Sequence, residues 1–251
     1  MNGPARSLVV VPTYNERESI AEVIRLLLAA VDHSVDMLVV DDSSPDGTAE
    51  VVKACARELE RVNLLVRPSK QGLAGAYVDG FTWGLERNYA SLVEMDADLS
   101  HSPADVARLL ARVGDADLVV GSRYVAGGGV RNWGLFRRML SSGANHYARG
   151  LLRFGVRDST SGLRAYRAEC LKDLDLNSIH SEGYAFQVEM TRRVAMRGGR
   201  IVEIPITFVE RARGRSKMSR AIFLEALVRV TKWGIEDRIF RRRTTSPPRA
   251  P

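Results

Sequence analysis

The sequence has few of the residues that build disulfide-stapled domains or zinc centres. Its 251 residues include two cysteines and four histidines. Cys55 and Cys170 lie far apart, and no CxxC or cysteine–histidine spacing typical of a zinc site occurs. The cysteine pattern therefore excludes a disulfide framework and a structural zinc, and it predicts a reducing compartment.

Long apolar runs and the common nucleotide-binding loops are also missing. No stretch approaches the roughly 20 apolar residues that a helix needs to cross a bilayer, and the first apolar run is too short for a secretory signal. The chain has no GxxxxGK[ST] segment, and Gly72, Gly75 and Gly80 lack the GxGxxG spacing. We therefore expect a soluble or peripheral membrane protein that is neither a P-loop enzyme nor a Rossmann dehydrogenase.

Positive charge is in excess. The 37 lysines and arginines outnumber the 30 acidic residues, so the formal net charge is +7. The excess gathers between Arg123 and Arg167 and between Arg211 and Arg243. This balance predicts an anionic partner, which is a nucleic acid, a phosphorylated substrate or an anionic membrane.

Short β-branched runs alternate with amphipathic segments in the first half of the chain. Strands are expected at residues 7–14, 37–42, 62–68, 91–96 and 117–124, with helices between them. The alternation predicts an α/β domain with a mostly parallel sheet, helices on both faces and ligands at the carboxyl ends of the strands. The later chain predicts a glycine-rich loop, a basic helix, a polar loop, a helix and one late strand at residues 125–134, 135–152, 157–167, 182–198 and 200–211.

A polar segment separates the fourth expected strand from the next helix. Ser102, Pro103 and Asp105 have the spacing of a helix-capping arrangement, which accounts for them at the start of a helix over 103–113. Asp96 and Asp98, which come before them, are not explained in this way.

Three uses of Asp96 and Asp98 compete: a metal site, an acid/base pair, and loop chemistry. An EF-hand loop starting at Asp96 is excluded because its sixth position is not glycine and its twelfth is Ala107. Both carboxylates of an Asp-x-Asp segment can face one pocket, where they suit Mg²⁺ or Mn²⁺ carrying substrate phosphates. For the neighbouring His101 we expect a local hydrogen bond rather than a metal bond.

Two other segments, "VVVPTYNE" and "VVDDSSPDGT", also place polar residues where an apolar strand ends. Taken alone, Asp42 and Asp46 are explained as residues that end a strand and cap a helix. The Asp-x-Asp segment after a third strand makes coincidence a poor explanation, so the three strand ends together predict one site.

These motifs bring a family into view. The chain resembles the inverting GT-A glycosyltransferases of family 2, and in particular the polyprenol (dolichol) monophosphate mannose synthases. The matching segments run in family order from about Ser7 to Ser219: "VVVPTYNERESI", "VVDDSSPDGTAE", "RPSKQGLAGAYVDGF", "MDADLSHSP", "GSRYVAGGGVRNWGLFRRMLSSGAN", "DSTSGLRAYR", "GYAFQVEM" and "IPITFVERARGRSKMS". The chain departs from some members at its carboxyl end, where they continue into transmembrane helices.

The resemblance implies a GT-A fold, a Mg²⁺ or Mn²⁺ cofactor, and transfer of mannose from GDP-mannose to a polyprenyl monophosphate. The guanosine part of the donor would contact Pro12, Tyr14, Glu16, Val40 and Asp42. Its diphosphate and the metal would contact Asp96, Ala97 and Asp98, most directly Asp98, with Ser100 as a further oxygen ligand. Diphosphate or sugar would also contact Arg123, Arg211 and Lys217, and the acceptor phosphate would contact Arg123, Arg137 and Ser141. Asp98 and Arg123 would be catalytic.

Elementary chemistry agrees with these roles. The reaction joins two anions, so a divalent cation and basic side chains offset their repulsion and stabilise the leaving diphosphate. A phosphate monoester has a second pKa of about 6 and attacks without a general base. The two aspartates are therefore needed for a metal rather than for proton transfer, and one displacement inverts the anomeric carbon. The resemblance implies a β-linked product.

The carboxyl-terminal segment has a narrow polar stripe at helical spacing, made by Glu225, Arg229, Lys232 and Glu236. It fits a helix packed on the catalytic domain as well as a helix lying on an anionic leaflet. A polyprenyl substrate favours the membrane surface, which the basic helix near residues 137–153 would share. We expect a catalytic domain at 1–219, an interface helix at 220–243 and a disordered tail at 244–251, peripheral on the cytoplasmic face, with a separate anchor protein as an open option.

Two alternatives remain. A glucosyltransferase using UDP-glucose would share the strand-end motifs, and only the later segments favour mannose. A nucleic-acid-binding module would explain the basic charge, but the chain lacks a basic stripe interleaved with aromatics, and this alternative leaves Asp96 and Asp98 unexplained. We therefore expect no nucleic-acid partner.

Overall fold

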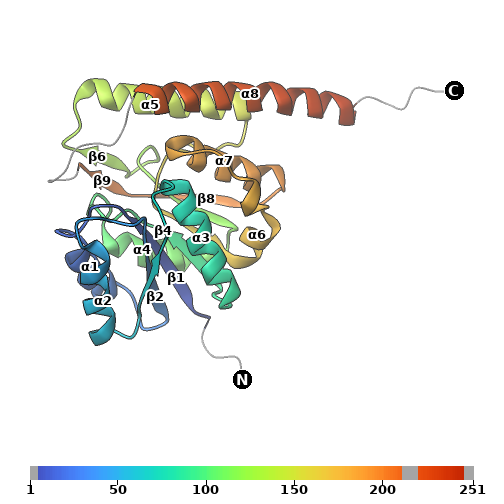
Figure 1. Cartoon of the computed structure of the whole chain (residues 1–251). Helices are drawn as coiled ribbons and strands as arrows, with labels where there is room; N and C mark the ends of the chain where they lie inside the picture. Colours follow the sequence, from blue (N-terminus) through green and yellow to red (C-terminus); the bar gives the residue numbers. More distant parts are fainter. Residues whose placement is uncertain (1–4, 211–219, 246–251) are drawn as a thin grey trace.

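A mixed seven-stranded sheet forms the centre of the protein, whose computed structural model describes residues 5–210 and 220–245 (Figure 1). Its strand order is β3-β2-β1-β4-β7-β5-β8. Strand β7 runs antiparallel to β4 and β5, and every other pairing is parallel. The strands are β1 (Ser7–Thr13), β2 (Val35–Asp41), β3 (Val62–Val66), β4 (Ser91–Glu94), β5 (Leu118–Ser122), β7 (Arg164–Arg167) and β8 (Ile201–Pro205). This confirms the predicted, mostly parallel α/β sheet.

Helices cover both faces of the sheet, because successive residues of each buried strand point to opposite sides. One apolar core joins the sheet to α1 (Ile20–Ala30), α2 (Thr48–Glu58) and α4 (Pro103–Val113). A second core joins the other face to α3 (Leu73–Glu86), α6 (Ala168–Asp173) and α7 (Gly183–Met196), with a 3-10 turn at Leu176–Ser178. Both layers are built from the 3.6-residue apolar pattern that the sequence shows.

A third layer lies along the edge of the molecule opposite the amino terminus (Figure 1). It contains two long helices, α5 (Leu135–Leu152) and α8 (Arg220–Thr245), which pack on each other and on α7 through Ala148, Val188 and Val230. Gly234 makes the contact close, since a Cβ there would lie 2.3 Å from Cγ of Leu151. Beside this layer, β6 (Gly129–Arg131) pairs with β9 (Thr207–Val209) in a small parallel sheet.

Three short strands fall where the sequence predicts loops or one longer strand. The loop expected at 125–134 contains β6, and the polar loop expected at 157–167 contains β7. Strand β7 has the sequence RAYR, in which Ala165 packs into one core and Tyr166 into the other. The arginines at both ends make this short segment look like a polar loop in the sequence. The single late strand is two strands, because the chain changes sheets at the buried Ile206.

The predicted cap of α4 is only partly right. The helix spans Pro103–Val113 with proline in its first turn, as predicted, but the Ser102 side chain makes no capping hydrogen bond. Asp105 instead accepts a bond of 2.5 Å from Nη1 of Arg108. The capping hydroxyl of Ser102 is exposed, so water can take the place of the expected bond.

Helix α8 packs along the protein and still presents apolar side chains to solvent. Asp237 is buried and receives both Nε and Nη2 of Arg192, whereas Val228 and Ile235 are exposed. None of the helices in the described residues has an apolar stretch of the length that a membrane span requires. The helix ends at Thr245, two residues beyond the predicted segment, and most of the predicted tail lies outside the described residues.

Candidate functional site

The carboxyl ends of β1, β2 and β4 bring the predicted donor residues to one edge of the sheet. Asp42, just past β2, is buried and accepts hydrogen bonds from the backbone N–H groups of Gln71 and Gly72. It also receives Nη1 of Arg67 at 2.7 Å. Asp42 thus holds the loop before α3 in place rather than capping α2.

Arg67 organises this loop, and the sequence analysis did not single it out. Its side chain is 4% exposed and binds three acceptors besides Asp42, namely Asp79 Oδ2 at 2.6 Å, Gln71 Oε1 at 2.9 Å and the Gly72 carbonyl. The signal available was an arginine directly after an apolar strand, in the segment "RPSKQG". A buried arginine needs several acceptors, so it fixes the segments that supply them.

The first strand end is held by similar bonds. Thr13 and Ser44 both bond the buried Asp41 carboxylate, at 3.0 and 2.6 Å. Asp46 accepts bonds from the backbone and hydroxyl of Thr48 at the start of α2, which confirms its predicted local role. Burial alone would raise the pKa of Asp46, but these bonds hold the pKa below its ordinary value.

The remaining predicted guanosine ligands lie around this edge. The backbone N–H of Glu16 bonds the Thr48 hydroxyl at 3.0 Å, and Nζ of Lys70 lies 3.8 Å from the centre of the Tyr14 ring. Pro12 and Val40 belong to adjacent strands and are paired in register. The fold therefore gathers Pro12, Tyr14, Glu16, Val40 and Asp42 at one edge.

The Asp-x-Asp segment follows β4 in a tight loop. Leu99 adopts the left-handed conformation, with φ of 60°, which is uncommon for a non-glycine residue and frequent at functional sites. Asp98 Oδ1 accepts a bond from the Ser100 N–H at 3.0 Å. The Asp96 side chain is 33% exposed, and a Cβ at Gly162 would lie 3.2 Å from its Oδ2. The loop is therefore closely packed but leaves Asp96 accessible.

Two buried polar side chains in this loop lack partners within the described part of the chain. They are the Ser100 hydroxyl and the His101 ring, neither of whose nitrogens has a hydrogen bond. Nε2 of His101 lies 3.5 Å from Asp96 Oδ2. The local hydrogen bond expected for His101 is therefore not formed within the described residues. The ring packs against Phe208, and its 3.5 Å contact with Asp96 Oδ2 does not have hydrogen-bond geometry.

These side chains fit a divalent cation that is shared with a substrate. Two carboxylates and an unpartnered hydroxyl are hard oxygen donors. No group of three or more His, Cys, Asp or Glu side chains in the described ranges forms a complete metal cage. A cation bound at Asp96, Asp98 and Ser100 would thus take its other ligands from water or from diphosphate oxygens.

Arg123, just past β5, is buried and firmly paired. Its Nε and Nη2 bind the two oxygens of Asp158 at 2.7 and 2.6 Å, and its backbone N–H binds the same carboxylate. Nη2 also binds the Thr160 hydroxyl at 2.8 Å. Burial alone would raise the pKa of Asp158, but the Arg123 charge and these bonds hold the pKa below its ordinary value. Both groups therefore stay charged.

Arg137, on the first turn of α5, is paired at the surface. Its Nη1 forms an ion pair with Oε1 of Glu210, and the two side chains are 33% and 38% exposed. The guanidinium also lies 4.3 Å from the Trp133 ring centre. Glu210 was not predicted because it follows β9, 73 residues along the chain.

A row of aromatic rings connects the Asp-x-Asp loop to the two arginines. His101 meets Phe208 edge-on with ring centres 5.2 Å apart, and Phe208 meets Trp133 at 5.4 Å. The Arg123 guanidinium lies 5.8 Å from Phe208 and 5.5 Å from Trp133. The loop predicted to bind the donor diphosphate and the arginines predicted to bind the acceptor phosphate are therefore close together, with packed aromatic rings between them.

Asn145 ties α5 to the loop that carries Asp158. Its Oδ1 accepts bonds from the backbone and hydroxyl of Ser159, and its Nδ2 donates to Thr160 and to the Ser141 carbonyl. Ser141 is predicted to contact the phosphate of the lipid acceptor. Its hydroxyl oxygen accepts a hydrogen bond of 2.8 Å from the Tyr124 hydroxyl. Arg123 and Ser141 are thus joined through one partly buried network.

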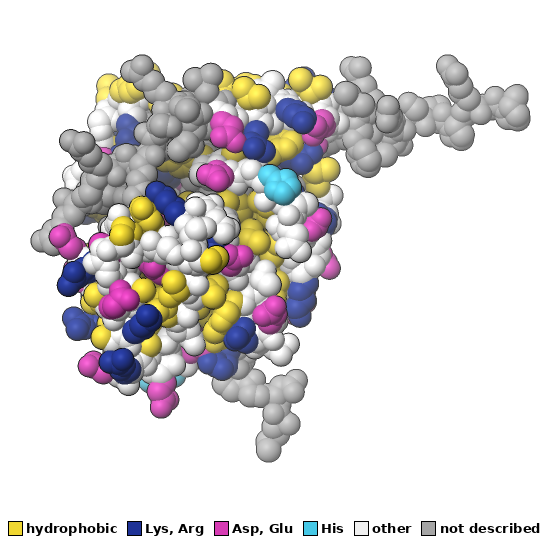
Figure 2. Space-filling view, viewed as in Figure 1, with side chains coloured by type: hydrophobic (Ala, Val, Ile, Leu, Met, Phe, Trp, Pro, Cys, Tyr) yellow, Lys and Arg dark blue, Asp and Glu magenta, His cyan; other side chains and the backbone are white. Residues whose placement is uncertain are grey.

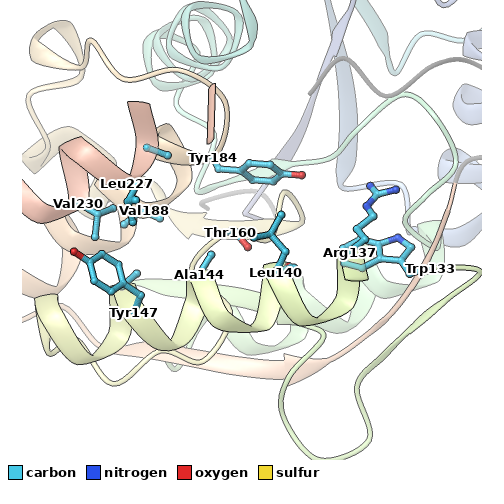
Figure 3. Close-up of a pocket in the computed structure, with 13 residues that line it drawn as sticks. Trp133, Arg137, Leu140, Ala144, Tyr147, Thr160, Tyr184, Val188, Leu227 and Val230 are labelled. Carbon is cyan, nitrogen blue, oxygen red and sulfur yellow. The ribbon is translucent and has the colours of Figure 1, made fainter. Parts of the chain in front are cut away.

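A mostly apolar pocket opens between α5, α7 and α8 (Figure 3). Arg137 and Trp133 lie at one end, and Tyr147 and Val230 lie at the other. Between the ends the lining includes Leu140, Ser141, Ala144, Thr160, Tyr184, Val188 and Leu227. Arg137 and Ser141 therefore line the same pocket, and Arg123 reaches its wall through Thr160. Arg211 and Lys217 lie outside the described residues.

Comparison with known proteins agrees with this architecture. The chain is 53% identical over 233 residues to an undecaprenyl-phosphate mannosyltransferase of Micrococcus luteus, covering 93% of this chain and 96% of that one. It is 49% identical over 243 residues to a polyprenol monophosphomannose synthase of Mycolicibacterium smegmatis, covering 95% and 90%.

The fold is similar to that of solved glucosyl-3-phosphoglycerate synthase from Mycobacterium tuberculosis. The structure with Mg²⁺ and UDP gives a TM-score of 0.68 at 21% identity over 91% of this chain and 80% of that one. The structure with Mn²⁺, UDP-glucose and phosphoglyceric acid gives 0.67 at 22% identity over 90% and 80%. Residues 8–175 match glycosyl transferase family 2. The predicted fold class is confirmed, and the chain belongs to glycosyl transferase family 2.

Proposed function

We propose that the protein transfers mannose from GDP-mannose to a polyprenyl monophosphate. The two relatives at 53% and 49% identity carry names for mannosyl transfer to undecaprenyl phosphate and for polyprenol monophosphomannose synthesis. The structural observation that carries the proposal is the pocket between α5, α7 and α8, which is mostly apolar and has an arginine at one end.

The pocket has one polar end and an otherwise apolar wall, as a lipid phosphate requires. A polyprenyl phosphate has a charged head and a long hydrocarbon tail, so its site needs a cation at one end and apolar walls beyond. Arg137, Ser141 and Thr160 supply the polar groups, and the wall towards Tyr147 and Val230 is apolar. We place the acceptor phosphate beside Arg137 and Ser141. Arg123 contributes through Thr160 and through its Nη1, since its Nε and Nη2 already bind Asp158.

The donor belongs at the strand ends on the other side of the aromatic row. We place guanosine at Pro12, Tyr14, Glu16, Val40 and Asp42, and the diphosphate at Asp96, Ala97 and Asp98, with Arg211 and Lys217 as further predicted contacts. Mg²⁺ or Mn²⁺ held by Asp96, Asp98 and Ser100 would neutralise the diphosphate and stabilise it as a leaving group.

The reaction is a single displacement. An oxygen of the acceptor phosphate forms a bond to the anomeric carbon of mannose, and the bond from that carbon to the diphosphate oxygen breaks with its electron pair. GDP leaves, and the configuration at carbon inverts. The phosphate monoester is already ionised at neutral pH, so no carboxylate has to accept a proton.

The acceptor comes from a bilayer, and α5 and α8 present the apolar surface to reach it. Leu135, Phe136 and Met139 on α5 are 74%, 80% and 66% exposed, and Val228 and Ile235 on α8 are 62% and 53% exposed. Figure 2 shows hydrophobic side chains along this edge of the molecule. We propose that this edge lies on the cytoplasmic leaflet, as a peripheral interface for which a separate anchor protein is optional.

One assay tests the function. The full chain is incubated with polyprenyl phosphate, Mg²⁺ or Mn²⁺, and either GDP-mannose or UDP-glucose, and the glycolipid product is measured. We expect mannolipid from GDP-mannose and little product from UDP-glucose. Asp98→Asn should abolish transfer while the circular dichroism and melting temperature stay unchanged. No product from GDP-mannose with any metal or lipid contradicts the proposal, and product from UDP-glucose alone replaces it.

Vesicle flotation tests the membrane surface. Phe136→Ser with Met139→Ser should weaken binding to anionic vesicles, because each change removes an exposed apolar side chain. Met196→Ser is a suitable control, because Met196 is 53% exposed on α7. Equal binding by the double variant and the wild type would contradict the assignment of this edge.

A further inference from the structure

We infer that Glu210 competes with phosphate groups for Arg137, and so weakens the binding of the acceptor, of the mannosylated product and of the surrounding phospholipids at the acceptor site. The inference rests on the proposed function, because it concerns the same acceptor phosphate. It assigns a role to a residue that the mechanism above does not use.

Glu210 is held where it meets the arginine. Its backbone N–H bonds the Arg131 carbonyl at 3.2 Å, which fixes the end of β9 beside β6. Its Oε1 pairs with Nη1 of Arg137, which lines the pocket. The Trp133 ring, 4.3 Å from the guanidinium, backs the arginine on another side. A phosphate that takes Nη1 of Arg137 must displace the Glu210 carboxylate.

The pair is weak enough to be displaced. Both side chains are about one-third exposed, and ion pairs that water reaches contribute little because solvent screens them. By contrast, Asp158 is fully buried and binds Arg123 through both oxygens. An arriving anion can therefore exchange with Glu210 but not with Asp158.

The exchange depends on the charge of the incoming group. A phosphate monoester carries close to two negative charges at neutral pH and offers three acceptor oxygens. A phosphodiester carries one charge, as the Glu210 carboxylate does, so exchange gains no charge attraction. Bilayer phospholipids and the mannosylated product are phosphodiesters, whereas the acceptor is a monoester. Because the same ion pair is broken in each case, Glu210 weakens the binding of all these phosphates by a similar factor. The second charge of the monoester keeps the acceptor bound at concentrations at which the diesters leave Arg137.

Steady-state kinetics of the full chain in mixed micelles test the inference. Glu210→Gln should lower the KM for polyprenyl phosphate about two- to fivefold, the range expected for loss of a partly exposed ion pair. It should also strengthen inhibition by added phosphatidylglycerol by a similar factor, and leave the KM for GDP-mannose unchanged. Glu225→Gln is the matched control, since Glu225 pairs with Arg229 at the surface and the two side chains are 49% and 36% exposed. It should change none of these values.

A double-variant cycle separates this role from others. In an Arg137→Gln background, Glu210→Gln should change neither the acceptor KM nor the inhibition by phosphatidylglycerol, because the competed group is gone. An unchanged or raised acceptor KM in Glu210→Gln, or a fall in kcat with the acceptor KM unaltered, would overturn the inference. If the wild type forms no mannolipid at all, it is the proposed function that fails.

Discussion

Two arginine–carboxylate pairs border the proposed acceptor pocket, and water reaches them very differently. Arg123 and Asp158 are 6% and 0% exposed, and three hydrogen bonds from Arg123 join them. Arg137 and Glu210 are about one-third exposed and are joined through one nitrogen and one oxygen. A guanidinium and a carboxylate therefore form a fixed buried ion pair at Arg123 and an exchangeable surface ion pair at Arg137.

Burial decides the difference because it sets the cost of separating the charges. A buried charge without its partner is very unfavourable, so the inner pair stays closed. An exposed charge is stabilised by water when its partner leaves. The inner arginine can thus position the wall of the pocket, and the outer arginine can take a ligand.

Breaking the inner pair should have the largest effect. Asp158→Asn leaves the Arg123 charge buried without a counter-charge, so we expect the free energy of unfolding to fall by about 3–5 kcal/mol, and mannosyl transfer to be lost. Urea denaturation and the transfer assay measure both. The control is Arg123→Met with Asp158→Leu, which should recover much of the stability but none of the transfer. A loss below about 1 kcal/mol for Asp158→Asn would show that the pair behaves like an exposed one.

Glu94 is a buried carboxylate without a bonded arginine, and it shows what burial does when the ion pair is missing. Burial raises the pKa of Glu94 to about 7 from an ordinary 4.5, and Arg164 and Gln187 offset only part of this rise. The folded state therefore binds this proton more tightly than the unfolded state does. Protonated Glu94 therefore stabilises the folded state relative to ionised Glu94. This contribution to the free energy of unfolding is fully present below pH 4.5 and is lost as the pH rises through about 7.

Glu94→Gln should remove this pH dependence. Relative to the wild type, the variant should gain stability between pH 4.5 and pH 8, by on the order of 3 kcal/mol at most. Denaturation at both pH values measures the gain. An equal difference from the wild type at the two values would show that Glu94 titrates as an exposed glutamate does.

Separating α8 from α5 should change the outer region alone. Gly234→Val puts a side chain where a Cβ would already lie 2.3 Å from Cγ of Leu151. We expect a loss of about 1–3 kcal/mol and a higher acceptor KM, because α8 lines the pocket. Gly150→Val is the matched change, since nothing lies within 4 Å of a Cβ there. Equal effects of the two variants on the acceptor KM would contradict the close packing.

Breaking the outer pair should have the smallest effect on stability. Glu210→Gln should change the free energy of unfolding by less than about 1 kcal/mol, because water screens the ion pair. Thermal denaturation beside Asp158→Asn gives the comparison directly. Similar losses in the two variants would remove the distinction between the pairs.

The sequence predicts the alternating strands and helices of the first half of the chain well. Strands β1 to β5 and the helices between them follow apolar periodicity, which is a local signal. Strands β6, β7 and β9 have only three or four residues each. Long-range pairing stabilises them, so no local pattern distinguishes them from loops.

The residues of the site likewise fall into those that a local sequence pattern predicts and those that only long-range contacts show. Asp42, Asp96 and Asp98 were predicted because they lie close after the ends of β2 and β4. Asp158 and Glu210 were not, since they meet their arginines from 35 and 73 residues away. Resemblance to a family identified the arginines, and only the structure shows that one is enclosed and the other is open to exchange.

The most direct test of this account is the kinetics of Arg137→Gln with each substrate varied in turn. If the outer arginine binds the acceptor phosphate, the KM for polyprenyl phosphate should rise about tenfold or more, as for the loss of a charged hydrogen bond. The KM for GDP-mannose should stay within about twofold of the wild type. A raised KM for GDP-mannose with an unchanged KM for polyprenyl phosphate would contradict the assignment of the two ends.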